Sequence, residues 1–138
     1  MNRRRFLLMT AALPLTLPVA AHAEEVVYSA DLLKSDLAAG KTVFLDFFAT
    51  WCPTCLAQHR VMDKLKAANP AYEAHVTFMT VDWDTWGDGD LVKQLQIPRR
   101  STLVVLKGDA ELGRIVADTS EVAIQALMDT ALQAATAA

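Results

Sequence analysis

The only two cysteines of the chain stand three residues apart, in the segment Cys52-Pro53-Thr54-Cys55. A disulfide between them closes so small a loop that it restrains the unfolded chain little, because the stabilisation by a disulfide grows with the length of its loop. Reactivity therefore explains the pair better than stability does. The spacing suits exchange between a dithiol and a disulfide, in which one thiolate attacks a foreign disulfide and the second thiol resolves the mixed disulfide.

The segment that follows Trp51 indicates which cysteine attacks. Cys52 stands at the predicted N-cap of a helix over residues 53–68, and Pro53 suits the first helical position. The Cys52 sulfur then faces the free amides of the first turn and the positive end of the helix dipole, which lowers its pKa from the ordinary value of about 8.5. Cys55 lies one turn further in, where we expect it to be more buried and to act as the resolving thiol.

A single carboxylate interrupts the strand predicted just before the cysteines. Residues 43–48 are apolar without alternation, as in a strand covered on both faces, except for Asp46. A carboxylate there is costly unless it has a partner or a task, and burial is expected to raise its pKa. A structural Asp46 bonded to backbone or water is the alternative.

The remaining pattern predicts one α/β domain in which helices cover both faces of a mixed sheet. Its 138 residues suffice for one hydrophobic core and leave no room for a second. The predicted elements are a strand at 26–28, a helix at 30–39, a strand at 43–48, a helix at 53–68, a strand at 75–81, a short helix at 91–95, strands at 101–106 and 111–116 joined through 107–110, and a helix from 118–121 onward with a fraying tail at 134–138.

The first 23 residues have the layout of a signal peptide, with arginines at 3–5, an uncharged stretch at 6–20 and the small-residue end Ala21-His22-Ala23. We expect cleavage after Ala23, a periplasmic location and a mature domain at 24–138, with an uncleaved membrane anchor as the alternative. A partial twin-arginine pattern leaves the export route open. Cleavage removes three arginines and no acidic residue, so the formal net charge changes from −3 to −6 and nucleic-acid binding is not expected.

Residues 44–55, Phe-Leu-Asp-Phe-Phe-Ala-Thr-Trp-Cys-Pro-Thr-Cys, resemble the signature of the thioredoxin superfamily, and the predicted order of elements is that of its fold. The resemblance covers essentially residues 24–135. It implies a thiol:disulfide oxidoreductase that needs no external cofactor and has protein thiols and disulfides as partners. It also implies that Asp46 takes or gives the proton of Cys55 through water.

Two positions depart from the family pattern. The family places a cis-proline before the Thr that opens the strand at 101–106, whereas Ser101 precedes Thr102 here. Because a cis bond before a non-proline residue costs about 2.5–4 kcal/mol, we expect a trans bond at Ser101 and an altered substrate groove. The family's lysine near the buried aspartate maps to about Phe78, so Asp46 is expected to lack a charged partner.

Five residues around Cys52 are expected to bind the substrate, namely Trp51, Pro53, Thr54, Arg100 and Ser101. Trp51 would shield the cysteines and offer a flat contact, with plain core packing as the alternative. Arg99 and Arg100 are interpreted mainly as solvated loop charges. The alternative is that they favour the Cys52 thiolate or select an acidic partner.

Metal binding is not expected from the remaining motifs. His59 would add only a third ligand to the two sulfurs, whereas a structural zinc site uses four, so we interpret it as an exposed helical histidine. The acidic segment 82–90 lacks the ordered spacing and closing Glu of a calcium loop. We expect a solvated loop in which Asp88 or Asp90 caps the next helix, with a docking patch built on its two tryptophans as the alternative.

The expected activity is reduction of protein disulfides by a monomer, with a membrane-embedded thiol protein as electron donor. The reducing direction is favoured because the chain lacks the inserted helical domain that the family's dedicated oxidants usually carry. A disulfide oxidase or isomerase is the alternative within the enzyme class. A copper- or zinc-handling protein and a non-catalytic binding module are the alternatives outside it.

Overall fold

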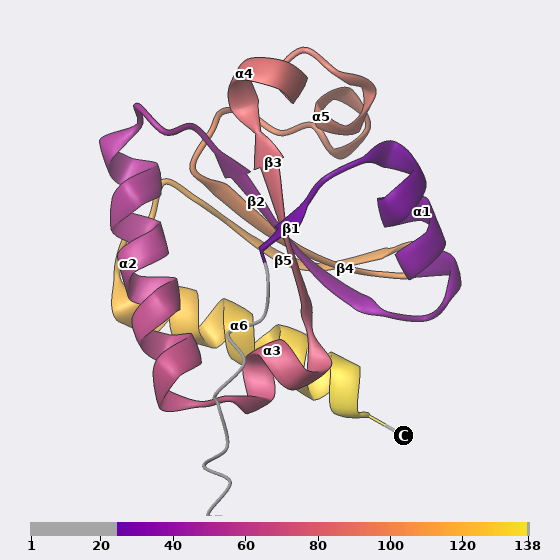
Figure 1. Cartoon of the computed structure of the whole chain (residues 1–138), viewed down its shortest axis with the longest axis vertical. Coiled ribbons are helices and arrows are strands. Elements are labelled where there is room, and N and C mark those ends of the chain that lie inside the picture. Colours follow the sequence, from indigo (N-terminus) through magenta and orange to yellow (C-terminus); the bar gives the residue numbers. More distant parts are fainter. Residues whose placement is uncertain (1–24, 138) are drawn as a thin grey trace, which may run out of the picture.

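A five-stranded sheet forms the centre of the protein, and the computed structural model describes residues 25–137 (Figure 1). The expected signal peptide lies outside the described residues. The strands are β1 (Val26–Val27), β2 (Thr42–Phe48), β3 (Thr77–Asp82), β4 (Thr102–Lys107) and β5 (Ala110–Val116). The helices are α1 (Ala30–Ala38), α2 (Pro53–Ala68), α3 (Ala71–His75), α4 (Trp83–Trp86), α5 (Asp90–Leu95) and α6 (Glu121–Thr136).

Strand β2 is the middle strand, in the order β1-β3-β2-β4-β5. It pairs parallel with β3 and antiparallel with β4, and β5 continues the sheet antiparallel to β4. All of β2 from Thr42 to Phe47 is buried, which agrees with its unbroken apolar sequence. The mixed sheet expected from the sequence is therefore confirmed.

Helices cover both faces of the sheet, and each face has its own core (Figure 1). Alternate residues of β2 divide between the two cores, because successive side chains of a strand point to opposite faces. Leu45 and Phe47 pack with α1, α4 and α5, whereas Phe44 packs with α2, α3 and α6. Asp46 shares the face of Phe44 and therefore looks toward α2.

The structure differs from the predicted elements in two connections. Residues 71–75 form α3, so β3 begins at Thr77 rather than at residue 75. Helix α2 ends at Ala68. The Asn69 side chain then accepts from the amide of Ala71, which forms a turn around Pro70 and leads into α3. In the segment expected to be a loop, Asp82 caps α4 by accepting from the amide of Asp84 and from the Thr85 hydroxyl.

Three smaller expectations are also corrected. Gly89, and not Asp88 or Asp90, occupies the N-cap of α5. The β4–β5 hairpin is joined by two residues, Gly108 and Asp109, because pairing extends to Lys107 and Ala110. Helix α6 continues to Thr136, where fraying was expected from residue 134.

No helix among residues 25–137 combines the length and the apolar character needed to cross a membrane.

Candidate active site

The topology of the sheet brings the two cysteines and Ser101 to one edge. Helix α2 begins after the carboxyl end of β2, and β4 runs antiparallel to β2, so the start of β4 lies beside that end. Thr102 pairs with Phe47, and the amide of Ser101 donates to the Phe47 carbonyl at 2.8 Å. Residues about 50 positions apart in the chain are therefore neighbours here.

Cys52 is the N-cap of α2, as predicted. Its backbone is extended, Pro53 occupies the first turn, and the Cys52 sulfur accepts a hydrogen bond from the amide of Cys55 at 3.2 Å. Both cysteines are free thiols, and both are buried. The sulfur thus occupies the place where an N-cap side chain satisfies a free amide and where the helix dipole favours negative charge.

Ser101 lies between the two sulfurs. Its hydroxyl oxygen is 3.1 Å from the Cys52 sulfur and 3.0 Å from the Cys55 sulfur, and its residue is fully buried. The peptide bond before it is trans, as expected, because residues 25–137 contain no cis bond. Its φ of 61° is left-handed, a conformation that a proline ring, with φ near about −65°, does not adopt.

The environment separates the pKa values of the two thiols. Burial disfavours the Cys52 thiolate, but hydrogen bonding from Cys55, Ser101 and Arg100 outweighs burial and lowers the pKa of Cys52 to about 7. Burial raises the pKa of Cys55, and the neighbouring Cys52 raises it further. The arrangement therefore presents one thiolate and one thiol near neutral pH, which suits the roles expected of Cys52 and Cys55.

Gln58 is a site residue that the sequence did not reveal. It is fully buried on α2, and its side-chain amide nitrogen donates to the carbonyls of Ser101 and Asp118, each at 3.0 Å. The amide of Ala117 donates to the same Ser101 carbonyl at 2.8 Å. Because glutamine is common on exposed helix faces, Gln58 can be recognised as a site residue only from its partners in the folded structure.

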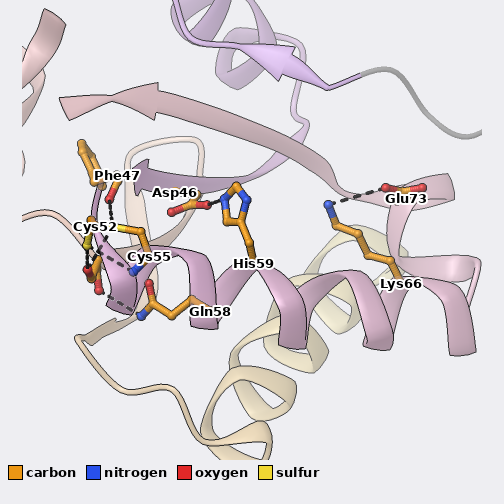
Figure 2. A network of polar contacts seen from close by, with 9 residues as sticks. Asp46, Phe47, Cys52, Cys55, Gln58, His59, Lys66 and Glu73 are labelled. Carbon is orange, nitrogen blue, oxygen red and sulfur yellow. Dashed lines mark hydrogen bonds and ion pairs between the residues drawn. The ribbon is translucent and has the colours of Figure 1, made fainter. Parts of the chain in front are cut away.

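Asp46 has a charged partner, contrary to the expectation, because His59 takes the place of the missing lysine (Figure 2). His59 was interpreted as an exposed helical residue, which is wrong. Its ring is mostly buried, hydrogen-bonds the Asp46 carboxylate and stacks on the Phe48 ring with centroids 4.1 Å apart. His59 follows Cys55 by four residues, so one turn of α2 separates it from the resolving thiol.

The Asp46–His59 pair is poised to hold a proton. Burial raises the pKa of Asp46, against the opposing effect of His59. The Asp46 carboxylate raises the pKa of His59, against the opposing effect of burial. The second carboxylate oxygen of Asp46 is buried without a hydrogen-bond partner. The structure records no direct contact between Asp46 and Cys55.

Trp51 is 54% exposed and forms the outer surface beside Cys52. Its indole nitrogen donates to the Asp84 carboxylate at 2.9 Å, and the Arg100 guanidinium stacks over its ring at 4.4 Å. Arg100 is therefore not the solvated loop charge that was expected, because it is half-buried and its guanidinium stacks on Trp51. Pro53 and Thr54 form the first turn next to this surface.

Two of the acidic residues of 82–90 serve local structure in this region, whereas Asp88 and Asp90 are exposed. Asp82 caps α4, and Asp84 holds Trp51. Trp83 and Trp86 are half-buried against the core of the α1 face, which leaves little of them for a docking patch. Among residues 25–137, no three His, Cys, Asp or Glu side chains are placed to hold a metal ion.

The sequence of the chain is similar to those of thioredoxins and of a thiol:disulfide interchange protein. The sequence model of the thioredoxin family matches residues 23–130. A thioredoxin of Echinococcus granulosus is 29% identical over 86 residues, which cover 62% of this chain and 75% of that protein. The thiol:disulfide interchange protein DsbE of Escherichia coli (strain K12) is 48% identical over 40 residues, 29% of this chain and 20% of DsbE. The match thus spans only a fifth of DsbE.

Solved structures show the same likeness over most of the fold. The protein Trxlp of Edwardsiella tarda is 30% identical, with a TM-score of 0.64 over 75% of this chain and 98% of that one. The thioredoxin of Malassezia sympodialis is also 30% identical, with a TM-score of 0.59 over 79% of this chain and 98% of that one.

Proposed function

The chain belongs to the thioredoxin family of thiol–disulfide oxidoreductases, and we propose that it reduces disulfides of other proteins through Cys52 and Cys55. The observation that carries this proposal is the Cys52 sulfur at the N-cap of α2, 3.2 Å from the Cys55 amide and 3.1 Å from the Ser101 hydroxyl. These donors stabilise negative charge on Cys52, and the thiolate is the form that attacks disulfides.

The reaction proceeds in two exchanges. The Cys52 thiolate attacks one sulfur of the substrate disulfide, so that the substrate S–S bond breaks, a Cys52–substrate disulfide forms and the other substrate sulfur leaves as a thiolate. Cys55 then loses its proton and attacks the Cys52 sulfur, which releases the second substrate thiolate. The substrate gains two electrons from the protein and two protons, one released by Cys55 and one from the solvent, and the protein retains a Cys52–Cys55 disulfide.

Asp46 is the proposed acceptor of the Cys55 proton. Its raised pKa, its buried carboxylate oxygen without a partner and its place on the α2 face of β2 support this role. Because the structure records no direct contact with Cys55, a water molecule would carry the proton. Trp51, Pro53, Thr54 and Arg100 would form the surface that receives the substrate.

The moderate lowering of the Cys52 pKa supports the reducing direction. A thiolate with a very low pKa, near about 3.5, stabilises the reduced form so strongly that the protein becomes an oxidant, whereas a pKa near about 7 accompanies a reducing couple. The pKa of about 7 at Cys52 therefore supports a reducing couple.

The proposal includes an exported, periplasmic protein. The layout of residues 1–23 supports export, and the DsbE relative supports a role in thiol exchange. In an oxidising compartment, the Cys52–Cys55 disulfide must be reduced again after each turnover. A membrane-embedded dithiol protein is the proposed donor, and the mature domain 24–138 is proposed to act as a monomer.

Two measurements on residues 24–138 test this function. A Cys55→Ala variant should accumulate a mixed disulfide with a disulfide-containing protein, visible on a non-reducing gel, whereas the matched Cys52→Ala variant should accumulate none. Equal trapping by both variants would contradict the assigned roles.

Equilibration of the wild-type domain with glutathione buffers gives the reduction potential. A value near about −270 mV is expected, and a value near about −120 mV would instead identify a disulfide oxidase.

A further inference from the structure

The Ser101 hydroxyl is the one side-chain group within hydrogen-bond reach of both sulfurs among the described residues. It lies 3.1 Å from the Cys52 sulfur and 3.0 Å from the Cys55 sulfur, in a position without solvent exposure. A hydroxyl has one proton to donate and two lone pairs to accept with, so it can serve both sulfurs at once.

The backbone around Ser101 fixes this hydroxyl in place. Its amide donates to Phe47 of β2, and its carbonyl accepts from Gln58 of α2 and from Ala117 after β5. Three elements thus hold one residue in a left-handed conformation with φ of 61°. Such a conformation is uncommon for a residue with a side chain and persists only where the surroundings impose it.

The two thiols determine the direction of the hydrogen bonds. Cys55 is the thiol that retains its proton, so its S–H can donate to the Ser101 oxygen at 3.0 Å, which is nearer than its other acceptor, the Phe47 carbonyl at 4.0 Å. Cys52 is the thiolate, so the Ser101 O–H donates to the Cys52 sulfur. The resulting chain runs from Cys55 through Ser101 to Cys52 and ends on the negative charge, which makes the last bond charge-assisted.

We propose that the Ser101 hydroxyl is a catalytic hydrogen-bond donor that stabilises the reduced Cys52/Cys55 couple and sets its reduction potential. This inference rests on the proposed function and adds to it the residue that adjusts the potential. The Cys52 thiolate exists only in the reduced state, since its charge disappears when the disulfide forms. The hydroxyl therefore stabilises the reduced state more than the oxidised one and raises the potential.

The titratable and charged side chains near Cys52 come from three segments of the chain. Cys55 comes from α2, Arg100 from the segment before β4, and Asp84 from α4, where it binds the neighbouring Trp51. The Asp46–His59 pair lies one turn further along α2. A change at Ser101 leaves all of these side chains present, so its effect on the couple can be measured separately.

The test compares the wild-type domain with a Ser101→Ala variant, which keeps a Cβ at the same backbone conformation and removes only the hydroxyl. Oxidation by glutathione disulfide transfers two electrons to give two glutathione thiols and the Cys52–Cys55 disulfide. The equilibrium constant for this oxidation should rise about tenfold in the variant, which is a potential lower by about 30 mV. The pH midpoint for alkylation of Cys52 should rise at the same time.

The pH dependence separates this role from packing. The effect of Ser101→Ala on the potential should be large above pH 8, where Cys52 is ionised, and should shrink below pH 6, where both proteins hold a neutral thiol. A constant difference at all pH values would indicate altered packing and would overturn the proposal. An unchanged potential and an unchanged Cys52 midpoint would overturn it as well.

Two further variants keep the test decisive if Ser101→Ala folds poorly. Ser101→Gly also removes the hydroxyl and suits the left-handed conformation, so it should lower the potential in the same way. Thr102→Val removes the adjacent buried hydroxyl, which donates to the Arg99 carbonyl and touches neither sulfur. It should leave the potential unchanged, and an equal shift in this control would count against the inference.

Failure of the inference is distinguishable from failure of the proposed function. If the wild-type domain traps substrate and has a reducing potential while Ser101→Ala is unchanged, the function stands and only the inference fails. If the wild-type domain forms no mixed disulfide, the function fails, whereas the effect of Ser101 on the couple is still measured in glutathione buffer.

Discussion

At the scale of single residues, His59 changes the interpretation of the buried carboxylate most. Asp46 stands on a covered strand, and His59 supplies a hydrogen bond to its carboxylate and, when protonated, the opposite charge. The same pairing keeps a proton within one turn of the resolving thiol. The site therefore has a hydrogen-bond donor, Ser101, beside the Cys52 sulfur and the Asp46–His59 pair one helical turn beyond Cys55.

Replacing His59 should reveal the free-energy cost of burying the Asp46 carboxylate. In His59→Leu the carboxylate loses its hydrogen bond, so the free energy of unfolding should fall by about 1–3 kcal/mol or more at pH 8. The pKa of Asp46 should rise further, and a raised pKa in the folded state means that stability decreases as pH rises through it. Urea unfolding at pH 5 and pH 8 should show the larger loss at pH 8.

The double variant Asp46→Asn/His59→Leu is the control for this experiment. Without an ionisable group at residue 46, the extra loss between pH 5 and pH 8 should disappear. The same pH dependence in the double variant would show that Asp46 is not its source.

At the scale of elements, the site depends on three segments that meet at one end of β2. Helix α2 presents Cys52 and Gln58, the start of β4 presents Ser101, and the segment before α6 presents the Asp118 carbonyl. Gln58 joins all three because its amide nitrogen donates to two backbone carbonyls. A buried amide with these partners holds the start of β4 against α2.

Gln58→Met should therefore destabilise the fold, since an apolar side chain of similar length removes the Gln58 donor from the Asp118 carbonyl and leaves the Ser101 carbonyl with the Ala117 amide alone. The free energy of unfolding in urea should fall by about 1–3 kcal/mol. Gln125→Met makes the same change on the exposed face of α6 and should stay within about 0.5 kcal/mol of the wild type. Equal effects of the two substitutions would mean that the Gln58 hydrogen bonds carry no net stability.

At the scale of the whole molecule, the active-site thiolate is linked to folding. Cys52 has a pKa of about 7 in the folded protein, below the ordinary cysteine value of about 8.5 that an unfolded chain approaches. A lowered pKa contributes stability that is complete above the unfolded value and is lost as pH falls through the folded one. The reduced protein should accordingly gain stability between pH 7 and pH 9.

This gain can be measured without interference from Cys55, whose raised pKa acts in the opposite direction. A Cys55→Ala variant keeps the backbone amide of residue 55 and the Ser101 hydroxyl beside Cys52. Its free energy of unfolding in urea should rise from pH 6 to pH 9 relative to a Cys52→Ala/Cys55→Ala variant. Parallel pH profiles of the two proteins would contradict a lowered Cys52 pKa.

Features that depend on neighbouring residues could be predicted from the sequence alone. The spacing of the cysteines, the proline at the first turn and the apolar run before them predicted the N-cap thiol and the central strand. The order of strands and helices followed from periodicity, because a helix and a strand each repeat over a few residues. The two short helices α3 and α4 were missed, since each is too short for its periodicity to show and each begins at a local side-chain hydrogen bond, a turn at Asn69 and a cap at Asp82.

The contacts between side chains that are distant in sequence are visible only in the folded protein. Ser101 lies 49 positions from Cys52, His59 reaches Asp46 across the space between a helix and a strand, and Gln58 bonds residues 43 and 60 positions away. The family resemblance alone drew attention to Ser101, and nothing in the local pattern distinguishes His59 or Gln58 from polar side chains on an exposed helix. The antiparallel pairing of β4 with β2 brings Ser101 to the cysteines, and the packing of α2 on the sheet brings His59 to Asp46.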